Sequence, residues 1–162
     1  MAFGIAFLAI YIGSIVLANW LVSRYGIIPI GFGLMAPAGV FAVGVTFPCR
    51  DYIQREMPYL GIAAIIVGAG ISWLISPVLA VASGATFLCS ETADAIIYTP
   101  LRKRFQWAIL ASGTVAIVVD SLLFLKLAHI PYSVALTGQI VGKAEVLLAV
   151  GLPTAWLVRK FS

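Results

Sequence analysis

The sequence predicts an all-α integral membrane protein with six transmembrane helices in a single domain, residues 1–162. Three observations predict this fold: the composition, the division into apolar runs, and the placement of basic residues. Of the 162 residues, 62% are hydrophobic and 10% are charged, and the mean hydropathy is +1.10. A soluble domain carries about 25% charged residues. This chain has too little polar surface to cover a globule in water, so hydrocarbon is the solvent that suits it.

Apolar runs bounded by charged or turn residues define the predicted spans. Each run is close to the ~20 residues that a helix needs to cross ~30 Å of hydrocarbon. The predicted spans are residues 2–23, 29–49, 59–80, 83–100, 105–127 and 132–158. The first run has no basic segment before it and is longer than the apolar core of a signal peptide, so we interpret it as a span. The links between spans are too short to hold a soluble domain.

The basic residues between the spans predict the orientation. With six spans, one side of the membrane receives seven of them: Arg50, Arg55, Arg102, Lys103, Arg104, Arg159 and Lys160. The other side receives two, Arg24 and Lys126. An excess of Lys and Arg marks cytoplasmic loops, so we expect both termini on the cytoplasmic side (N-in/C-in) of the cytoplasmic (inner) membrane. The same clustering argues against nucleic-acid binding, despite the net charge of +4.

The second predicted span contains several turn residues: Gly31, Gly33, Pro37 and Gly39. We predict a helix broken near Pro37. A proline leaves a backbone carbonyl unpaired, which in a membrane must bond to a neighbour or line a wet cavity. Broken helices of this kind border binding sites in transporters, and a simple kink is the alternative.

Ionisable residues inside the predicted spans mark a candidate site. Such groups cost at least a few kcal/mol in hydrocarbon and therefore face the bundle interior. Glu91 and Asp94 share one helix face, and so do Gln139 and Lys143, whereas Glu145 points away from Lys143.

The depth of these residues supports a common site. Counted from the basic ends at ~1.5 Å per residue, Glu91 lies roughly 16 Å deep, and Asp120 and Lys143 roughly 24 Å deep. Pro37 lies at about 20 Å on the same scale. Polar or irregular features from four spans thus fall in one central slab.

Two explanations of these groups remain open. A buried Asp120–Lys143 ion pair could simply hold two helices in register. That pair leaves Glu91 and Asp94 unexplained, because three acids would face one lysine, and an unpaired acid is protonated or bound to something else. We therefore predict a solute-binding cavity. Its candidate residues are Asp120, Glu91, Asp94, Gln139, Lys143, Phe87, Phe124 and Asn19.

Other polar features suggest no enzyme, cofactor or metal centre. The one histidine, His129, lies in a predicted loop, and the two cysteines are interpreted as small apolar residues. Gly138–Lys143 is one residue short of a phosphate-binding loop, so Gly138 and Gly142 predict close helix packing instead. We expect a pair between Asp51 and Arg55, one turn apart, at the cytoplasmic surface and away from solute.

The order of several short motifs resembles that of the vitamin uptake transporter family over almost the whole chain. The motifs are Ala18-Asn19-Trp20-Leu21, Asp51-x-x-x-Arg55, Glu91-x-x-Asp94, Pro100-Leu101-Arg102, Asp120-Ser121 and Gln139-x-x-x-Lys143. The resemblance implies a transporter that imports the queuosine precursors 7-cyano-7-deazaguanine and 7-aminomethyl-7-deazaguanine. The alternative is a substrate-binding subunit of an ATPase-driven vitamin importer.

The chemistry of these residues is compatible with a guanine-like base. Such a base presents a ring N–H and an amino group side by side, which one carboxylate accepts together. Its carbonyl needs a donor such as Gln139 or Lys143, and its flat face suits Phe87 or Phe124. The expected partners are therefore this small molecule and the lipid bilayer, and a homodimer is left open.

Overall fold

Helices make up most of the described chain, which comprises residues 2–75 and 80–161 of a computed structural model. In chain order the elements are α1 (Ala2–Tyr25), β1 (Ile27–Gly31), β2 (Leu34–Pro37), α2 (Val40–Glu56), α3 (Pro58–Ile75), α4 (Ala80–Leu101), η1 (Arg102–Arg104), α5 (Phe105–Leu127), α6 (Tyr132–Val146), η2 (Leu147–Gly151) and α7 (Leu152–Phe161). The 3-10 turn η1 joins α4 to α5, and the π-helical η2 joins α6 and α7 into one run.

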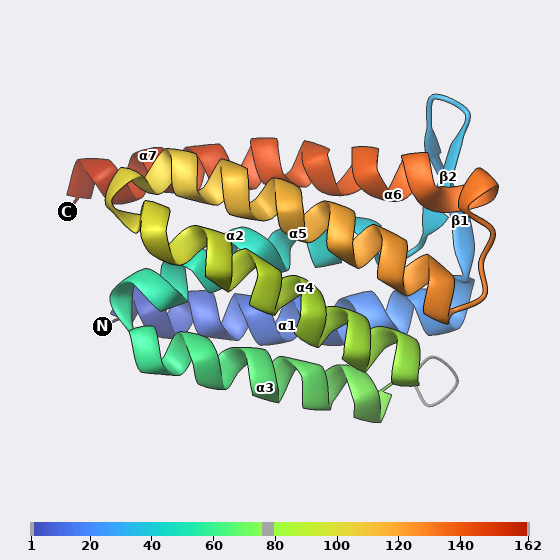
Figure 1. The fold of residues 1–162 in the computed structure, drawn as a ribbon, viewed down its shortest axis with the longest axis horizontal. Helices are drawn as coiled ribbons and strands as arrows, with labels where there is room; N and C mark the ends of the chain where they lie inside the picture. Colours follow the sequence, from blue (N-terminus) through green and yellow to red (C-terminus); the bar gives the residue numbers. More distant parts are fainter. Residues whose placement is uncertain (1, 76–79, 162) are drawn as a thin grey trace.

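The helices lie side by side along one direction, and both termini are at the same end of the bundle (Figure 1). The most extensive packing is between α4 and α5, which form an antiparallel hairpin. Helix α1 packs against α2 and α3, and α6 packs against α2 and α5. The chain therefore runs back and forth between two ends, as a membrane bundle does.

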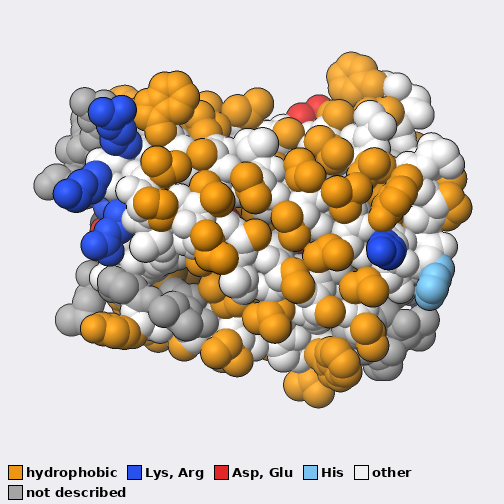
Figure 2. Space-filling view, in the orientation of Figure 1, with side chains coloured by type: hydrophobic (Ala, Val, Ile, Leu, Met, Phe, Trp, Pro, Cys, Tyr) orange, Lys and Arg blue, Asp and Glu red, His pale blue; other side chains and the backbone are white. Residues whose placement is uncertain are grey.

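Three helical segments of the described chain are long and apolar enough to cross a membrane: Gly4–Tyr25, Val81–Leu127 and Tyr132–Trp156. The second consists of α4 and α5, which reverse direction at η1. Hydrophobic side chains cover the middle of the face in Figure 2, and basic side chains gather at the end where the termini lie. An apolar belt with charged ends is the surface of a membrane-embedded protein.

Two clusters of buried apolar side chains hold the helices together. One joins α2, α4, α5, η2 and α7 and includes Phe47, Tyr98, Phe105, Ile109, Leu147 and Ala155. The other joins α1, α2, α3 and α4 through Tyr11, Ile15, Cys49, Ile53, Ala64 and Phe87. The helices are apolar on their outer faces as well, because those faces meet lipid, so hydrophobic periodicity could not identify which residues are buried.

The prediction of a broken helix near Pro37 is wrong, because residues 27–37 form a β-hairpin. Strands β1 and β2 pair antiparallel, with Ile27 opposite Pro37 and Ile28 opposite Ala36. The hairpin lies at the end of the bundle opposite the termini (Figure 1). Helix α2 begins only at Val40.

Local sequence explains why this segment avoids the helical conformation. Gly26, Gly31 and Gly33 have φ values of 62°, 101° and 71°, a region that glycine adopts without strain. Pro29 and Pro37 lack the N–H that an interior helical turn needs. Pairing between the two strands satisfies the backbone groups that a helix would otherwise have satisfied.

The hairpin explains the small residues on α6. A Cβ added to Gly138 would lie 2.0 Å from the carbonyl oxygen of Met35 in β2, and one added to Gly142 would lie 3.1 Å from Val40 Cγ2. The close packing predicted at Gly138 and Gly142 is therefore confirmed. At Gly138 its partner is the backbone of a strand, not a second helix.

Other predicted spans agree with the observed helices to within a few residues. Helices α1 and α5 and the α6–α7 run correspond to the predicted spans 2–23, 105–127 and 132–158. Helix α4 is slightly longer than predicted at both ends. The predicted span 59–80 corresponds to α3, which ends at Ile75, and the link predicted between this span and 83–100 lies partly in α4, which begins at Ala80. Residues 76–79 are outside the described residues.

We predict that Gly138→Ala destabilises the protein. The added methyl group meets a backbone oxygen that cannot move aside without displacing the hairpin, and overpacking of this kind costs about 1–3 kcal/mol. The matched control is Gly13→Ala on α1, where a Cβ would have no neighbour within 4 Å. Thermal unfolding of the detergent-purified variants should show a lower midpoint for Gly138→Ala alone. Equal midpoints for the two variants would contradict the close contact.

Candidate functional site

A pocket lies inside the bundle and is lined by residues from β2 and from every helix between α1 and α6. The lining residues are Ile15, Ala18, Asn19, Val22, Pro37, Gly39, Val40, Val43, Thr46, Ser72, Ser83, Thr86, Phe87, Asp120, Phe124, Gln139 and Lys143. The centre of a water molecule can move through ≈ 50 Å³ of it. That is room for about three to five waters, which suits a small solute.

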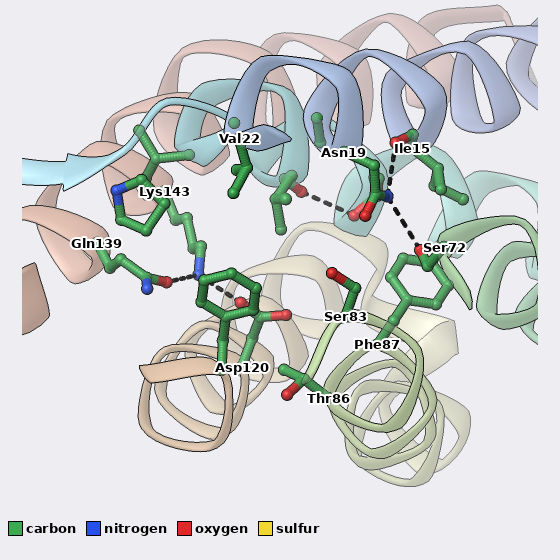
Figure 3. Close-up of a pocket in the computed structure, with 17 residues that line it drawn as sticks. Ile15, Asn19, Val22, Ser72, Ser83, Thr86, Phe87, Asp120, Gln139 and Lys143 are labelled. Carbon is green, nitrogen blue, oxygen red and sulfur yellow. Dashed lines mark hydrogen bonds and ion pairs between the residues drawn. The ribbon is translucent and has the colours of Figure 1, made fainter. Parts of the chain in front are cut away.

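Lys143 organises the polar side of the pocket. Its ammonium group forms an ion pair with Asp120 and donates hydrogen bonds to the Gln139 side-chain oxygen and, at 3.3 Å, to Ser121 Oγ (Figure 3). The ammonium has three N–H groups, and these contacts give each of them an acceptor. Lys143 therefore joins α5 to α6 and holds Asp120 and Gln139 in place.

Three groups at the pocket wall can form further hydrogen bonds. Gln139 Nε2 and Thr86 Oγ1 have no hydrogen-bond partner among the described residues, although the two residues are only 2% and 1% exposed. A buried polar group left unpaired costs about 1–3 kcal/mol. The second oxygen of Asp120 accepts only a long bond, 3.4 Å, from Ser90 Oγ. These three groups are available to a ligand.

The remaining wall is aromatic and amide in character. Phe87 of α4 lies across the pocket from Lys143 (Figure 3), and Phe124 of α5 also lines it. Asn19 donates from Nδ2 to the Ile15 carbonyl at 2.9 Å and to Ser72 Oγ at 3.2 Å. A ligand in this space meets polar groups at one side and an aromatic ring at the other.

The structure divides the predicted site residues between two places. Asp120, Gln139, Lys143, Phe87, Phe124 and Asn19 come together in the pocket. Glu91 and Asp94 do not line it, although both are fully buried. The prediction that all eight residues share one cavity is therefore wrong for these two acids.

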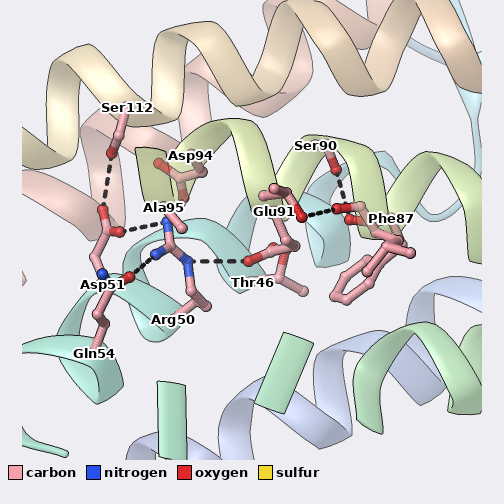
Figure 4. A network of polar contacts seen from close by, with 12 residues as sticks. Thr46, Arg50, Asp51, Gln54, Phe87, Ser90, Glu91, Asp94, Ala95 and Ser112 are labelled. Atoms are coloured by element: carbon pink, nitrogen blue, oxygen red, sulfur yellow. Dashed lines mark hydrogen bonds and ion pairs between the residues drawn. The ribbon is translucent and has the colours of Figure 1, made fainter. Parts of the chain in front are cut away.

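Glu91 and Asp94 belong to a cluster around Arg50, which sequence reasoning had assigned to a cytoplasmic loop. The Arg50 guanidinium lies 2.8 Å from Asp51 Oδ1 and 3.1 Å from Glu91 Oε2, and it forms a third ion pair with Asp94 (Figure 4). All four side chains are 0% exposed. We call Arg50, Asp51, Glu91 and Asp94 the arginine cluster.

The expected surface pair between Asp51 and Arg55 is also corrected. Asp51 is buried, pairs with Arg50 and accepts a hydrogen bond from Ser112 Oγ at 3.2 Å. Arg55 is 28% exposed; it lies 3.8 Å from Glu56 and 4.5 Å from the centroid of the Phe105 ring. Because α2 continues to Glu56, Arg50 and Asp51 sit inside the bundle and not in a loop. The sequence contained one signal for this cluster: three acids in the predicted spans would face only Lys143, so a second buried cation was required.

The other titratable or metal-binding candidates lie apart from the pocket. Glu145 is exposed on α6, away from the buried Lys143. Cys49 is buried, Cys89 is exposed, and both are free. Within residues 2–75 and 80–161, no group of three His, Cys, Asp or Glu side chains is arranged to hold a metal ion.

Comparisons with known proteins add no assignment: no protein-family model matches the chain, and no curated protein or solved structure matches it either.

We predict that Arg50→Gln severely destabilises the protein. Removing the guanidinium leaves three buried carboxylates without a cation, and breaking a buried ion pair in this way costs about 3–5 kcal/mol. The control is Arg24→Gln, which removes an exposed arginine at the end of α1. Monodispersity and the thermal midpoint in detergent should fall for Arg50→Gln only. Adding Asp94→Asn to Arg50→Gln should recover part of the loss, and failure to recover any would argue against the charge explanation.

Proposed function

We propose that this chain is a multi-pass transporter of the cytoplasmic membrane that imports a guanine-like base, 7-cyano-7-deazaguanine or 7-aminomethyl-7-deazaguanine. The observation that carries the proposal is the polar pocket inside an apolar bundle, where Gln139 Nε2 is buried beside Asp120 and has no hydrogen-bond partner in the described part of the chain. The ordered motifs shared with the vitamin uptake transporter family support this choice of solute.

The pocket offers a partner for each edge of such a base. The carboxylate of Asp120 accepts the ring N–H and the amino group, and the Gln139 amide N–H donates to the carbonyl. Lys143 already has three acceptors, so it positions these two residues and leaves the carbonyl to Gln139. Thr86 Oγ1 can accept the pyrrole N–H, and Phe87 offers a face for stacking.

Selectivity follows from the same groups. Adenine has no N–H next to an amino group on its pairing edge and no carbonyl. It could therefore donate at most one hydrogen bond to Asp120, and it would offer no carbonyl to the Gln139 amide. A site built to pair buried polar groups rejects analogues that lack them far more strongly than a hydrophobic site rejects a change in size.

For the topology we propose six membrane crossings with both termini in the cytoplasm. Arg50 no longer counts as a loop residue, because it is buried. Six basic residues then remain at the end with the termini, against two, Arg24 and Lys126, at the other end. This excess still favours a cytoplasmic location for that end. The crossings are α1, α2, α3, α4, α5 and the α6–α7 run.

Impermeant thiol labelling tests the topology. In a chain with Cys49 and Cys89 replaced by alanine, Arg24→Cys should react with the reagent in right-side-out membrane vesicles. Lys103→Cys should react only after the vesicles are permeabilised, because it lies at the cytoplasmic end. The opposite pattern would show that the bundle is inverted.

Binding to folded, detergent-purified protein tests the pocket. Asp120→Asn should weaken the binding of 7-cyano-7-deazaguanine by about ten- to a hundredfold, because it removes a charged, bidentate acceptor worth about 1.5–3 kcal/mol. Thr86→Val should weaken it by about two- to tenfold without disturbing the fold, since Thr86 Oγ1 has no partner among the described residues.

The control for these variants is Glu145→Gln, on the exposed side of α6, which should bind as the wild type does. Wild-type affinity in both pocket variants, or competition by adenine equal to that by guanine analogues, would reject the proposed site. Uptake by the chain alone in proteoliposomes would also distinguish this transporter from a substrate-binding subunit, which requires separate ATPases.

A further inference from the structure

The arginine cluster is short of positive charge. One guanidinium faces three carboxylates, and all four side chains are 0% exposed. With every acid ionised, the cluster carries a net charge of −2 (+1 from Arg50 and −3 from Asp51, Glu91 and Asp94). Uncompensated charge in a low-dielectric interior costs several kcal/mol for each ion, and a buried acid relieves that cost by binding a proton.

The geometry of the cluster favours protons over a metal cation as the missing charge. The guanidinium already occupies the position between the acids and would repel a second cation there. The unused sites are at its edge: Glu91 Oε1 and Asp94 Oδ1 have no hydrogen-bond partner among the described residues. A proton on one of these oxygens reduces the charge of the cluster, and a proton on Glu91 also weakens the ion pair between Glu91 and Arg50.

Neighbouring side chains do not supply the positive charge that the arginine cluster lacks. The titratable and charged side chains that face Glu91 from the surrounding helices are Tyr11 of α1, Cys49, Arg50 and Asp51 of α2, Asp94 of α4 and Asp120 of α5. The tyrosine and the cysteine supply no positive charge, and the charge of Asp120 is already matched by Lys143 of α6. Arg50 is therefore the one cation acting directly on Glu91 within the described chain.

The cluster adjoins the pocket on the side of the proposed cytoplasmic end. Thr46 lines the pocket and lies beside Glu91 (Figure 4), and Ser90, the residue before Glu91, donates to Asp120. Asp94 is seven residues beyond Phe87 along α4, about 10 Å nearer to the end with the termini. The ion pairs from Arg50 to Glu91 and Asp94 therefore tie α2 to α4 between the pocket and that end.

We propose that the arginine cluster is a proton-binding gate that couples solute import to the proton gradient. A proton from outside forms an O–H bond at the Glu91 carboxylate and weakens its ion pair with Arg50. Helices α2 and α4 can then separate on the cytoplasmic side of the pocket, and both the solute and the proton leave to the cytoplasm. This coupling rests on the proposed function, whereas proton binding by the cluster does not.

Infrared spectroscopy of the purified protein tests proton binding without any solute. As the pH is lowered, wild-type protein should gain the C=O stretch of a protonated carboxyl group in an apolar environment. Glu91→Gln should remove or halve this band, and the control Glu145→Gln should retain it. Absence of the band from the wild type, or its persistence unchanged in Glu91→Gln, would overturn the proton site.

Transport in proteoliposomes tests the coupling. An inward proton gradient of about one pH unit should drive about tenfold accumulation of 7-cyano-7-deazaguanine, if one proton enters with each solute. Glu91→Gln, which lies outside the pocket, should keep solute exchange without a gradient but lose the accumulation. Glu145→Gln should accumulate solute as the wild type does.

The outcomes separate the two proposals. Wild-type exchange that is unaffected by a proton gradient, or full accumulation by Glu91→Gln, would reject the coupling and leave the proposed transport intact. A wild type that neither binds nor exchanges the base would reject the proposed function, while the infrared result would still decide whether the cluster holds a proton.

Discussion

The organisation of this protein depends on the cost of burying charge in an apolar bundle. Water is not available to solvate a buried ion, so each one needs partners supplied by the other helices. Lys143 pairs with Asp120 of α5 and donates to Gln139 of its own helix. Arg50 forms ion pairs with Glu91 and Asp94 of α4. Both cations thereby join helices that apolar contacts alone would hold less specifically.

The two cations produce sites with different properties. Around Lys143 the charges balance, and the unused hydrogen-bonding capacity includes neutral groups, the Gln139 amide and the Thr86 hydroxyl. A site of this kind can bind the polar edge of a solute through hydrogen bonds of defined geometry. Around Arg50 three carboxylates face one cation. A buried carboxylate that lacks a cation tends to bind a proton. Their positions along α4 bring the two sites next to each other in the bundle.

Backbone hydrogen bonding imposes a second constraint, which the β-hairpin satisfies. The segment between α1 and α2 contains prolines and positive-φ glycines that cannot continue a helix. The two strands pair with each other and place the Met35 carbonyl against Gly138 of α6. The hairpin also brings Pro37 to the pocket wall, so an irregular segment borders the pocket even though the helix predicted there does not form.

The sequence by itself determined that the chain is an apolar helical protein and where α1, α5 and the α6–α7 run lie. It also identified Asp120, Gln139 and Lys143 as buried polar residues, but it missed the burial of Arg50 and Asp51. Those features follow from local composition, because hydrocarbon tolerates only apolar surface and paired backbone. It could not decide how the buried groups pair. Glu91 was predicted to share one central slab with Asp120, yet it pairs with Arg50, since helix rotation and the true length of α2 set its direction. Likewise, prolines and glycines predicted a break near Pro37 but not a hairpin. Only the tertiary structure decided these points, because each depends on which helix supplies the nearest partner.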